Sequence, residues 1–363
     1  MTQLKRIVIS GYYGFSNAGD EAALSAIVRG LKLQADVDIT VFSASPEETA
    51  KLHGVRALPR MSVSQVIRAL KDCDLLISGG GSLIQDATSL RSLIYYLAVI
   101  SLAKRYRRKV MILGQGIGPL RRSISRRLVR KALAGVDLIT VRDAQSAELL
   151  AKMEIGPVRV TADPTFTLEP CSEEEVLHLL NETGLSDQDD VIAVSLRKLD
   201  YLPGIPDFSP DIMGLLADEA RKLPAKLLLV GMQSPDDLVL AKEIGEKTGI
   251  AYQSRQWTPE QMLGALGKCR LVVGMRLHSL IFAASAGVPF LGIAYDPKVE
   301  SFAAATGQLY MTVEEAFAGQ LADNVTRIWG IRDQLVARLT TTVPAMRQAA
   351  EENTRLAAEL ISD

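Results

Sequence analysis

A cationic turn follows the apolar run Leu271–Val273. Arg276 and His278 alternate there with apolar residues, and Ser279 stands at the start of a segment with helical period. A guanidinium fork, an imidazole and the N–H groups of a helix start are groups that bind phosphate or carboxylate. We therefore expect an anion site at this turn, with Leu277 within it and Ser279 capping the helix.

Further cations follow other apolar runs. Arg142, Arg197 and Lys298 each come just after such a run, and Arg142 is followed directly by Asp143. The chain holds 41 Lys and Arg against 42 Asp and Glu, a formal net charge of -1. Cations gathered at strand ends on a nearly neutral chain predict a small, highly charged anionic ligand. For Arg142, a surface ion pair with Asp143 is the alternative.

A glycine-rich loop, Gly11–Glu21, lies between an apolar run near the N-terminus and a helical segment. Its spacing matches neither the dinucleotide fingerprint nor a Walker loop. Glycines let the backbone approach a ligand, and a helix start offers N–H groups to an anion or a sugar hydroxyl. Asp20 and Glu21 can complement the helix dipole. Alternatively, the carboxylate of Asp20 binds a hydroxyl group of a ligand.

Two other loops repeat the pattern of a strand followed by glycines. Gly79, Gly80 and Gly81 stand in a row and lead to Gln85. Consecutive glycines cost backbone entropy, so we expect close approach to a ligand rather than only a tight turn. Gly114–Pro119 follows the same pattern with less polar chemistry.

Short apolar runs that end in glycine or a polar turn, each followed by a helical segment, are typical of buried parallel strands with crossover helices. The predicted strands are Arg6–Ser10, Ile39–Phe42, Leu75–Ser78, Val110–Leu113, Leu138–Val141, Arg159–Thr161, Ile192–Ser195, Leu227–Val230, Leu271–Val273 and Pro289–Ile293. The fold class is therefore α/β, with two doubly wound, Rossmann-like domains facing a cleft. Ligands bind beyond the carboxyl ends of such strands.

With 363 residues the chain is long enough for two domains. We place an N-terminal α/β domain at 1–169, a C-terminal one at 170–343, and a final helix at 344–363. An acidic segment follows the boundary, and Ser172–Glu175 in it predicts a capped helix. The tail from Leu321 onward is expected to form helical segments broken at Pro344, the last packing back on the first domain.

Composition excludes several classes of protein. Apolar residues make up 48% and charged residues 23%, as in ordinary globular proteins. Cys73, Cys171 and Cys269 fit neither a disulfide framework nor a zinc site, and they suit a reducing cytoplasm, so we expect a cytoplasmic protein. The apolar stretches are too short or too interrupted for a signal peptide or a membrane span. His53 and His178 are expected to be bystanders on surface helices.

A basic cluster falls in the first domain. A solvated helix face is the usual explanation, and peripheral contact with anionic lipid, at about 1 kcal/mol per cation, is the second. No recognition motif accompanies the charge, so we expect no nucleic-acid partner. The cluster comprises Arg105, Arg107, Arg108, Lys109, Arg121, Arg122, Arg126, Arg127, Arg130 and Lys131.

Taken in order, these motifs resemble those of the polysaccharide pyruvyl transferase family. The resemblance runs over about residues 6 to 300. Within the family, the chain is most similar to bacterial enzymes that pyruvylate a secondary cell wall polymer. The motifs that carry it are Gly11-Tyr12-Tyr13-Gly14, Asn17, Gly19-Asp20-Glu21, Gly79-Gly80-Gly81, Gly114-Gln115-Gly116-Ile117-Gly118-Pro119, Arg142-Asp143, Asp163-Pro164 and Met275-Arg276-Leu277-His278-Ser279.

The resemblance implies a fold like that of two-domain GT-B glycosyltransferases, with phosphoenolpyruvate as co-substrate and no nucleotide or metal cofactor. It also implies a ketal product, in which pyruvate bridges two hydroxyls of a sugar. That sugar would be N-acetylmannosamine in a lipid-linked precursor of a polymer that anchors S-layer proteins.

Under this resemblance the site residues take roles. Phosphoenolpyruvate would bind Arg276, Leu277, Ser279, Lys298, Arg197 and Arg142, and His278 would protonate its methylene carbon. The acceptor sugar would bind the first domain, with Asp20 as a base, and its ligands would be Asn17, Gly19, Gly80, Gly81 and Gln85. Two alternatives stay open: a GT-B glycosyltransferase that uses a nucleotide sugar, and a non-catalytic protein that binds a cell-wall precursor.

Overall fold

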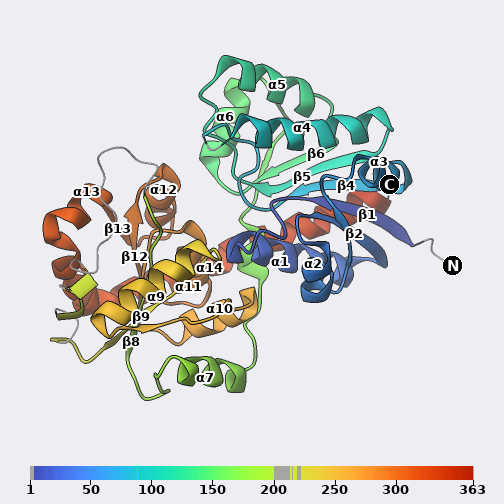
Figure 1. Cartoon of the computed structure of the whole chain (residues 1–363). Helices are drawn as coiled ribbons and strands as arrows, with labels where there is room; N and C mark the ends of the chain where they lie inside the picture. The colour runs from blue at the N-terminus through green and yellow to red at the C-terminus, as the bar shows by residue number, and fades with distance from the viewer. Residues whose placement is uncertain (1–3, 88, 200–212, 215, 219–221, 363) are drawn as a thin grey trace. The chain divides into compact units, whose positions relative to one another are not determined.

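The computed structural model describes residues 4–87, 89–199, 213–214, 216–218 and 222–362 (Figure 1). The chain divides into two compact units. Unit 1 consists of Met1–Leu168 and Met346–Asp363, and unit 2 of Glu169–Ala345. The sequence placed the division near Glu169.

Unit 1 is built on a sheet of seven parallel strands in the order β3-β2-β1-β4-β5-β6-β7. The order reverses between β1 and β4, which is where ligands bind in sheets of this kind. The strands are β1 Lys5–Ser10, β2 Val37–Ser43, β3 Arg56–Pro59, β4 Leu75–Gly79, β5 Lys109–Gln115, β6 Leu138–Val141 and β7 Arg159–Val160. The helices are α1 Ala18–Gln34, α2 Pro46–His53, α3 Val63–Asp72, α4 Leu90–Arg105, α5 Ser123–Leu133, α6 Ala144–Lys152 and the 3₁₀ helix η1 Pro164–Thr167.

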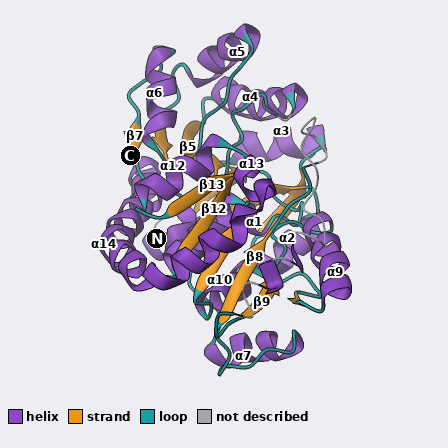
Figure 2. Cartoon of the chain, turned by 90° about the vertical axis from the view of Figure 1, so that its left-hand side faces the viewer, coloured by secondary structure: helices purple, strands orange, loops and turns teal. Residues whose placement is uncertain are grey.

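Unit 2 repeats this architecture with six parallel strands in the order β10-β9-β8-β11-β12-β13 (Figure 2). Its order reverses between β8 and β11. The strands are β8 Val191–Ser195, β9 Lys226–Leu229, β10 Ala251–Tyr252, β11 Leu271–Gly274, β12 Phe290–Ala294 and β13 Leu309–Thr312. The helices are α7 Glu173–Glu182, α9 Asp236–Thr248, α10 Pro259–Gly267, α11 Leu277–Ser285, α12 Pro297–Ala305, α13 Val313–Glu315, the π helix η2 Ala316–Gln320 and α14 Leu321–Ser362.

Both faces of each sheet are covered, as the continuous apolar runs of the strands require. In unit 1, α3, α4, α5 and α6 bury apolar side chains on one face, and α1 and the end of α14 cover the other. In unit 2, α9 and the first part of α14 pack on one face. On the other face, Leu280 of α11 fits against Gly274 and Gly292, where the strands have no side chain.

The strands that the sequence did not reveal, β3, β10 and β13, all lie at the edges of the sheets. An edge strand pairs on one side only, so it does not need the apolar run that marks a central strand. In β3, for example, both Arg56 and Pro59 are exposed. Each predicted central strand agrees with an observed one to within two or three residues.

Helix α14 runs without interruption through Pro344, so the predicted break there was wrong. A proline inside a helix removes one backbone hydrogen bond and costs about 3 kcal/mol. The helix is held on both sides of the proline, by buried Leu335 and Leu339 before it and buried Asn353 after it. Tertiary packing therefore outweighs the local cost.

Asn353 anchors the last turns of α14 in unit 1. Its Oδ1 accepts hydrogen bonds from the hydroxyls of Thr140 at 2.7 Å and Thr161 at 2.9 Å, and its Nδ2 donates to the carbonyl of Ala162 at 3.0 Å. A fully buried amide with these partners satisfied specifies one docking position for the helix.

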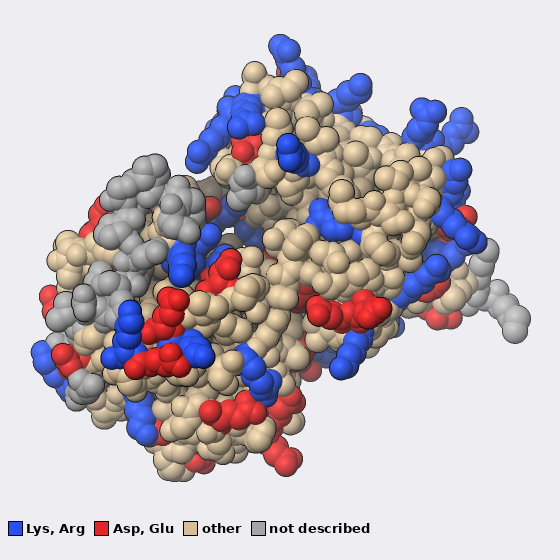
Figure 3. Space-filling model, in the orientation of Figure 1, with Lys and Arg blue, Asp and Glu red and all other residues tan. Residues whose placement is uncertain are grey.

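The surface of unit 1 is strongly charged in one region. Figure 3 shows Lys and Arg side chains gathered over α4 and α5. Both helices contain cations and no acid. None of the helices in the described ranges has the length and apolar character needed to cross a bilayer.

Candidate functional site

Arg276 stands in the turn after β11, where the strand order of unit 2 reverses. Gly274 makes this turn tight, because a Cβ there would lie 2.3 Å from Oγ of Ser279 and 2.7 Å from Cδ2 of Leu280. Only glycine lets α11 begin so close to the strand. The first N–H groups of α11 therefore lie at the carboxyl edge of the sheet, next to Arg276.

A buried carboxylate fixes the Arg276 guanidinium. Asp237, whose side chain is 1% exposed, accepts from Nε at 3.0 Å and from Nη2 at 2.7 Å. Its Oδ2 also accepts from the backbone N–H groups of Met232 at 3.2 Å and Gln233 at 3.0 Å. This bidentate pair uses two of the five N–H donors of a guanidinium and holds the group in one orientation.

Arg197 reaches across the end of β11. It follows β8, yet its Nη1 donates to the hydroxyl of Tyr295 after β12 at 3.1 Å, and its guanidinium carbon lies 4.9 Å from that ring's centroid. Strand β11 lies between β8 and β12, so the side chain spans the same edge as Arg276. Lys298, half-buried, lies in the first turn of α12, which Asp296 caps. Unit 2 thus brings together three of the predicted cations.

His278 is the second residue of α11. The residue is half-buried, and its Nε2 atom is enclosed by the protein. Leu277, also half-buried, precedes it as the first residue of the helix. The imidazole therefore stands at the helix start, beside the turn that carries Arg276.

The predicted capping role of Ser279 was wrong. Arg276 occupies the N-cap position, and Ser279 is the third residue of α11 and wholly buried. Its hydroxyl donates back to the carbonyl of Arg276 at 2.6 Å, and its backbone N–H donates to the same carbonyl at 3.0 Å. The buried side chain of Ser279 therefore stabilises the turn and does not face a ligand.

At the switch point of unit 1, Asp20 meets the glycine loop after β4. A Cβ on Gly81 would lie 2.2 Å from Oδ1 of Asp20, and the φ of Gly81 is +66°. Gly80 has φ +72°, and a Cβ added to it would lie only 2.8 Å from the Cβ of Ala23. Only glycine satisfies both conditions. The structure therefore brings the predicted acceptor residues Asp20, Gly80 and Gly81 together.

Tyr13 ties the same two loops. It is fully buried, and its hydroxyl donates to the carbonyl of Gly79. Burial first, and then the nearby carboxylates of Asp20 and Glu21, raise the pKa of Tyr13 well above its ordinary value. The phenol therefore stays protonated and remains a donor. The sequence pointed to the glycines around Tyr13 and assigned the tyrosine no role.

Asn17 and Gln85 use their amide oxygens within their own loops. Oδ1 of Asn17 caps α1 by accepting from the N–H groups of Gly19 at 3.0 Å and Asp20 at 3.2 Å. Oε1 of Gln85 accepts from the N–H of Ala87 at 2.7 Å. Any sugar contact made by Asn17 would therefore come from its Nδ2 group. Gly19 lies in the first turn of α1 and is buried.

Arg142 belongs to unit 1, whereas Arg197, Arg276 and Lys298, with which the sequence grouped it, belong to unit 2. Its Nη1 donates to Asp163 at 2.8 Å and its Nη2 to Ser82 at 3.1 Å, with the side chain 7% exposed. Gly116 leaves the space, since a Cβ there would lie 2.9 Å from Nε. The expected pair with Asp143 is longer, at 3.7 Å.

His53 is not a bystander on the surface, contrary to prediction. Its Nε2 lies 2.9 Å from Oε2 of Glu21, with side chains 1% and 6% exposed. Oε1 of Glu21 accepts from the N–H of Gly14 at 2.7 Å, so the pair supports the first glycine loop. His178, 72% exposed, matches its prediction.

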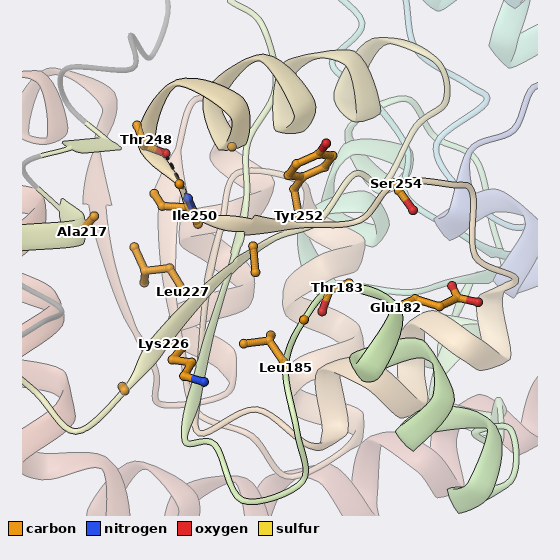
Figure 4. A pocket seen from close by; sticks show the side chains of 15 residues that line it. Glu182, Thr183, Leu185, Ala217, Lys226, Leu227, Thr248, Ile250, Tyr252 and Ser254 are labelled. Carbon is orange, nitrogen blue, oxygen red and sulfur yellow. Dashed lines mark hydrogen bonds between the residues drawn. The ribbon is translucent and has the colours of Figure 1, made fainter.

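A cavity of about 630 Å³ opens at the opposite, amino edge of the unit 2 sheet (Figure 4). Leu227, Ile250 and Tyr252 line it, together with the charged residues Lys226 and Glu182. None of the predicted site residues lines this cavity, so it does not belong to the chemistry of the carboxyl edge. In the described part of the chain, no group of three or more His, Cys, Asp or Glu side chains is arranged to hold a metal ion.

Comparison with known proteins supports the fold and the family. The family model described as polysaccharide pyruvyl transferase matches residues 17–297. The amylovoran biosynthesis protein AmsJ of Erwinia amylovora is 22% identical, over 81% of this chain and 84% of that protein. This relative and the family model place the similarity in polysaccharide biosynthesis.

Solved structures share the fold at low identity. Anabaena Alr3699/HepE, in complex with UDP and glucose, superposes with a TM-score of 0.63 at 13% identity, covering 99% of each chain. UDP-GlcNAc 2-epimerase from Neisseria meningitidis, bound to UDP-GlcNAc, gives 0.65 at 14% identity, covering 99% of this chain and all of that one, 100%. The architecture is that of the GT-B glycosyltransferases and epimerases.

Proposed function

The chain belongs to the polysaccharide pyruvyl transferase family, and from that premise we propose that it transfers pyruvate from phosphoenolpyruvate to a sugar as a ketal, with release of phosphate. The acceptor we propose is N-acetylmannosamine in a lipid-linked precursor of a cell wall polymer that anchors S-layer proteins. The observation that carries the proposal is the carboxyl edge of unit 2, where Asp237 fixes Arg276 beside His278 and the start of α11.

Phosphoenolpyruvate carries a phosphate and a carboxylate on three carbons, so its site needs several cations in a small space. Arg276 is held rigidly by Asp237, and the first N–H groups of α11 favour an anion next to it. Arg197 lies at the same edge, and Lys298 lies in the turn after β12. We assign the phosphate to Arg276 and the helix start, and the carboxylate to Arg197 or Lys298.

The proposed reaction needs one proton donor to begin. His278 gives a proton to the methylene carbon of phosphoenolpyruvate, which makes C2 an oxocarbenium-like electrophile. A sugar hydroxyl attacks C2, and the C2–O bond to phosphate breaks. The second hydroxyl then attacks C2 to close the ring. Of the two protons that the hydroxyls lose, one returns to His278 and the other leaves with phosphate.

The acceptor belongs to unit 1 in this proposal. The Asp20 carboxylate rests against Gly81 at the switch point, and we place the hydroxyls of the sugar there. Asp20 would orient the attacking hydroxyl, take its proton and pass that proton to the departing phosphate. Arg142 stays a predicted contact of phosphoenolpyruvate, and its pairs with Asp163 and Ser82 would also shape the loop that carries the acceptor.

The test is a product analysis with the full chain. The enzyme is incubated with phosphoenolpyruvate and an alkyl glycoside of N-acetylmannosamine, and mass spectrometry follows the sugar while phosphate is measured. We expect the pyruvyl mass increment on the sugar and one phosphate per product. Phosphate release without a modified sugar, or no reaction with either substrate, would contradict the proposal. Coupled phosphate release would also exclude a protein that only binds the precursor.

A second candidate is a glycosyltransferase that uses a nucleotide sugar. It is favoured by the fold, since the similar structures contain UDP or a UDP-sugar. Thermal unfolding separates the two candidates. At a ligand concentration of about 100 Kd, binding stabilises a protein by about 2.7 kcal/mol, so the true donor raises the Tm by several degrees. Stabilisation by a UDP-sugar and none by phosphoenolpyruvate would favour the glycosyltransferase.

A further inference from the structure

The segment 87–136 is unlike the rest of the chain in its charge. It holds twelve of the 41 Lys and Arg residues and none of the 42 Asp and Glu residues. The segment spans α4 and α5, which pack against each other on one face of the unit 1 sheet. Seven of the twelve cations lie on these two helices and the other five between them, and together they create a local field that the chain as a whole lacks.

Most of these cations are exposed and not neutralised by neighbours. Among the described residues of the segment, the only ion pair joins Arg130 to Glu154. Arg126 donates to a backbone carbonyl. The exposed cations are Arg91, Arg105, Arg107, Arg121, Arg122, Arg126, Arg127, Arg130 and Lys131.

Large apolar side chains are exposed among the cations. Ile94 on α4 is 47% exposed and Ile124 on α5 is 49% exposed. Met61 and Val63, at the start of α3, are 76% and 70% exposed. These four side chains are not part of the buried core of unit 1, to which α3, α4 and α5 contribute other apolar residues.

The apolar side chains lie near those cations that stand at the starts of the helices. Arg60, next to Met61, lies 4.3 Å from the ring centroid of Tyr95, next to Ile94. The hydroxyl of Tyr95 also donates to the carbonyl of Arg60 at 3.2 Å. Asp86, just before α4, accepts from the N–H groups at the start of α5 at 2.7 and 2.9 Å. These contacts join the starts of α3, α4 and α5.

This surface lies at the edge that carries the candidate acceptor site. Helices α3, α4 and α5 begin after β3, β4 and β5, so their first turns all lie at the carboxyl edge of the parallel sheet. The glycines that meet Asp20 follow β4 at that edge. A substrate held at the surface would therefore be presented to Gly80 and Gly81 from the α4 side.

We propose that the starts of α3, α4 and α5 form a docking rim that binds the surface of an anionic membrane. The arginines contact lipid headgroups, and the apolar side chains enter the boundary between headgroups and acyl chains. The rim consists of Met61, Val63, Arg91, Ile94, Arg121, Arg122, Ile124 and Arg127. This binding goes beyond the proposed function, because it requires no pyruvyl transfer.

The exposed apolar side chains decide between a membrane and a nucleic acid. A nucleic-acid backbone satisfies arginines equally well, but it offers no apolar phase to isoleucine, valine and methionine. A lipid surface takes up both kinds of side chain at once. The rim also lacks exposed aromatic rings on which bases could stack.

The test is co-sedimentation of the full chain with vesicles of phosphatidylcholine alone or mixed with phosphatidylglycerol. We expect binding to the anionic vesicles only, and weaker binding at high salt. The charge-reversal variant Arg91→Glu, Arg121→Glu, Arg122→Glu, Arg127→Glu should bind at least about a hundredfold more weakly, at about 1 kcal/mol per cation. None of these side chains makes a hydrogen bond within the described structure and all four are exposed, so folding should persist.

A matched control carries the same change in net charge elsewhere: Lys51→Glu, Lys247→Glu, Arg327→Glu and Arg347→Glu, all at exposed positions. It should bind anionic vesicles far better than the rim variant. A second variant, Ile94→Ser with Ile124→Ser, keeps every charge and should bind about tenfold more weakly than wild type. Phosphate release with a soluble acceptor should be unchanged in all three.

Three outcomes would overturn the proposal. Wild type that binds no anionic vesicle is one, and equal loss of binding in the rim and control variants is another. The third is binding of single-stranded RNA with no binding to vesicles, which would make the surface a nucleic-acid site. Because vesicle binding is measured without substrates, its failure is distinct from a failure of pyruvyl transfer.

Discussion

The carboxyl edges of the two sheets share one strand order and differ in their chemistry. In unit 1 the switch point holds glycines with positive φ against the Asp20 carboxylate, with Glu21 buried behind it. In unit 2 the corresponding position holds Arg276 and His278. The buried acid there, Asp237, forms an ion pair with Arg276.

Topology thus fixes where a ligand meets each sheet, while the residues after the strands fix which ligand it is. A carboxylate beside bare backbone suits hydroxyl groups, and fixed cations at a helix start suit an anion. We therefore assign the neutral sugar to unit 1 and phosphoenolpyruvate to unit 2. The predictions that follow test this division.

The largest effect should come from the imidazole. His278→Ala should lower kcat by ~10²- to 10⁴-fold, the usual contribution of a general acid, while phosphoenolpyruvate still binds. Steady-state phosphate release and calorimetry measure the two quantities. His178→Ala is the matched control, because that side chain is exposed at 72% and should be silent. Normal turnover of the His278→Ala variant would show that His278 is not the general acid.

Removing the fixed guanidinium should act on the donor. Arg276→Ala should raise the KM for phosphoenolpyruvate about 10- to 100-fold, as expected for a charge-assisted bond, and Arg276→Lys should not restore it, since lysine cannot form the bidentate pair with Asp237. The control is Arg255→Ala, which breaks an exposed bidentate pair with Glu182. Equal effects of the two alanine variants would show that Arg276 is only structural.

Gly81→Ala should impair the acceptor side alone. The new Cβ would lie 2.2 Å from Asp20 Oδ1, so the carboxylate must move. We expect lower turnover with unchanged binding of phosphoenolpyruvate. Gly54→Ala is the matched control: it has φ +59° and nothing within 4 Å of the Cβ position, so it carries only the backbone strain of about 1–2 kcal/mol. Equal turnover in the two variants would contradict the role of Asp20.

The smallest effect concerns stability and pH at the rim. Burial favours a higher pKa for Asp86, but hydrogen bonds from the N–H groups of Arg121 and Arg122 outweigh it and lower that pKa from 3.8. A carboxyl with a lowered pKa stabilises the fold above its unfolded pKa, and this stability is lost as pH falls through the folded value. Asp86→Asn should therefore cost about 1–2 kcal/mol at neutral pH.

The same variant is followed by Tm across pH. The gap between wild type and Asp86→Asn should be constant near neutrality and close in acid, below the unfolded pKa of 3.8. A gap that persists in strong acid would mean that the carboxylate charge does not hold the start of α5.

The sequence was informative where burial leaves a pattern. Central strands such as β11 show as apolar runs, and the residues after them include both switch points, so Asp20, Gly81, Arg276 and His278 could be identified in advance. The edge strands β3, β10 and β13 were not recognised in the sequence. Pro344 was misread because the packing that holds α14 together on both sides of it comes from distant residues.

The partners of site residues could not be identified in the same way. Asp237 lies 39 positions from Arg276 in the sequence, and at the start of α9 it looks like an ordinary helix-dipole acid. Glu21 and His53 meet only because α1 and α2 fold side by side. Ser279 precedes a helical run as a cap would. The tight turn at Gly274, however, lets the helix begin three residues earlier, with Arg276 at the N-cap.

The most direct test of the division between the units is a calorimetric titration of the full chain with phosphoenolpyruvate and, separately, with UDP-glucose. We expect saturable binding of phosphoenolpyruvate to one site per chain and no heat from the nucleotide sugar. Saturable binding of UDP-glucose together with no binding of phosphoenolpyruvate would contradict it, and would assign the cationic edge of unit 2 to a nucleotide.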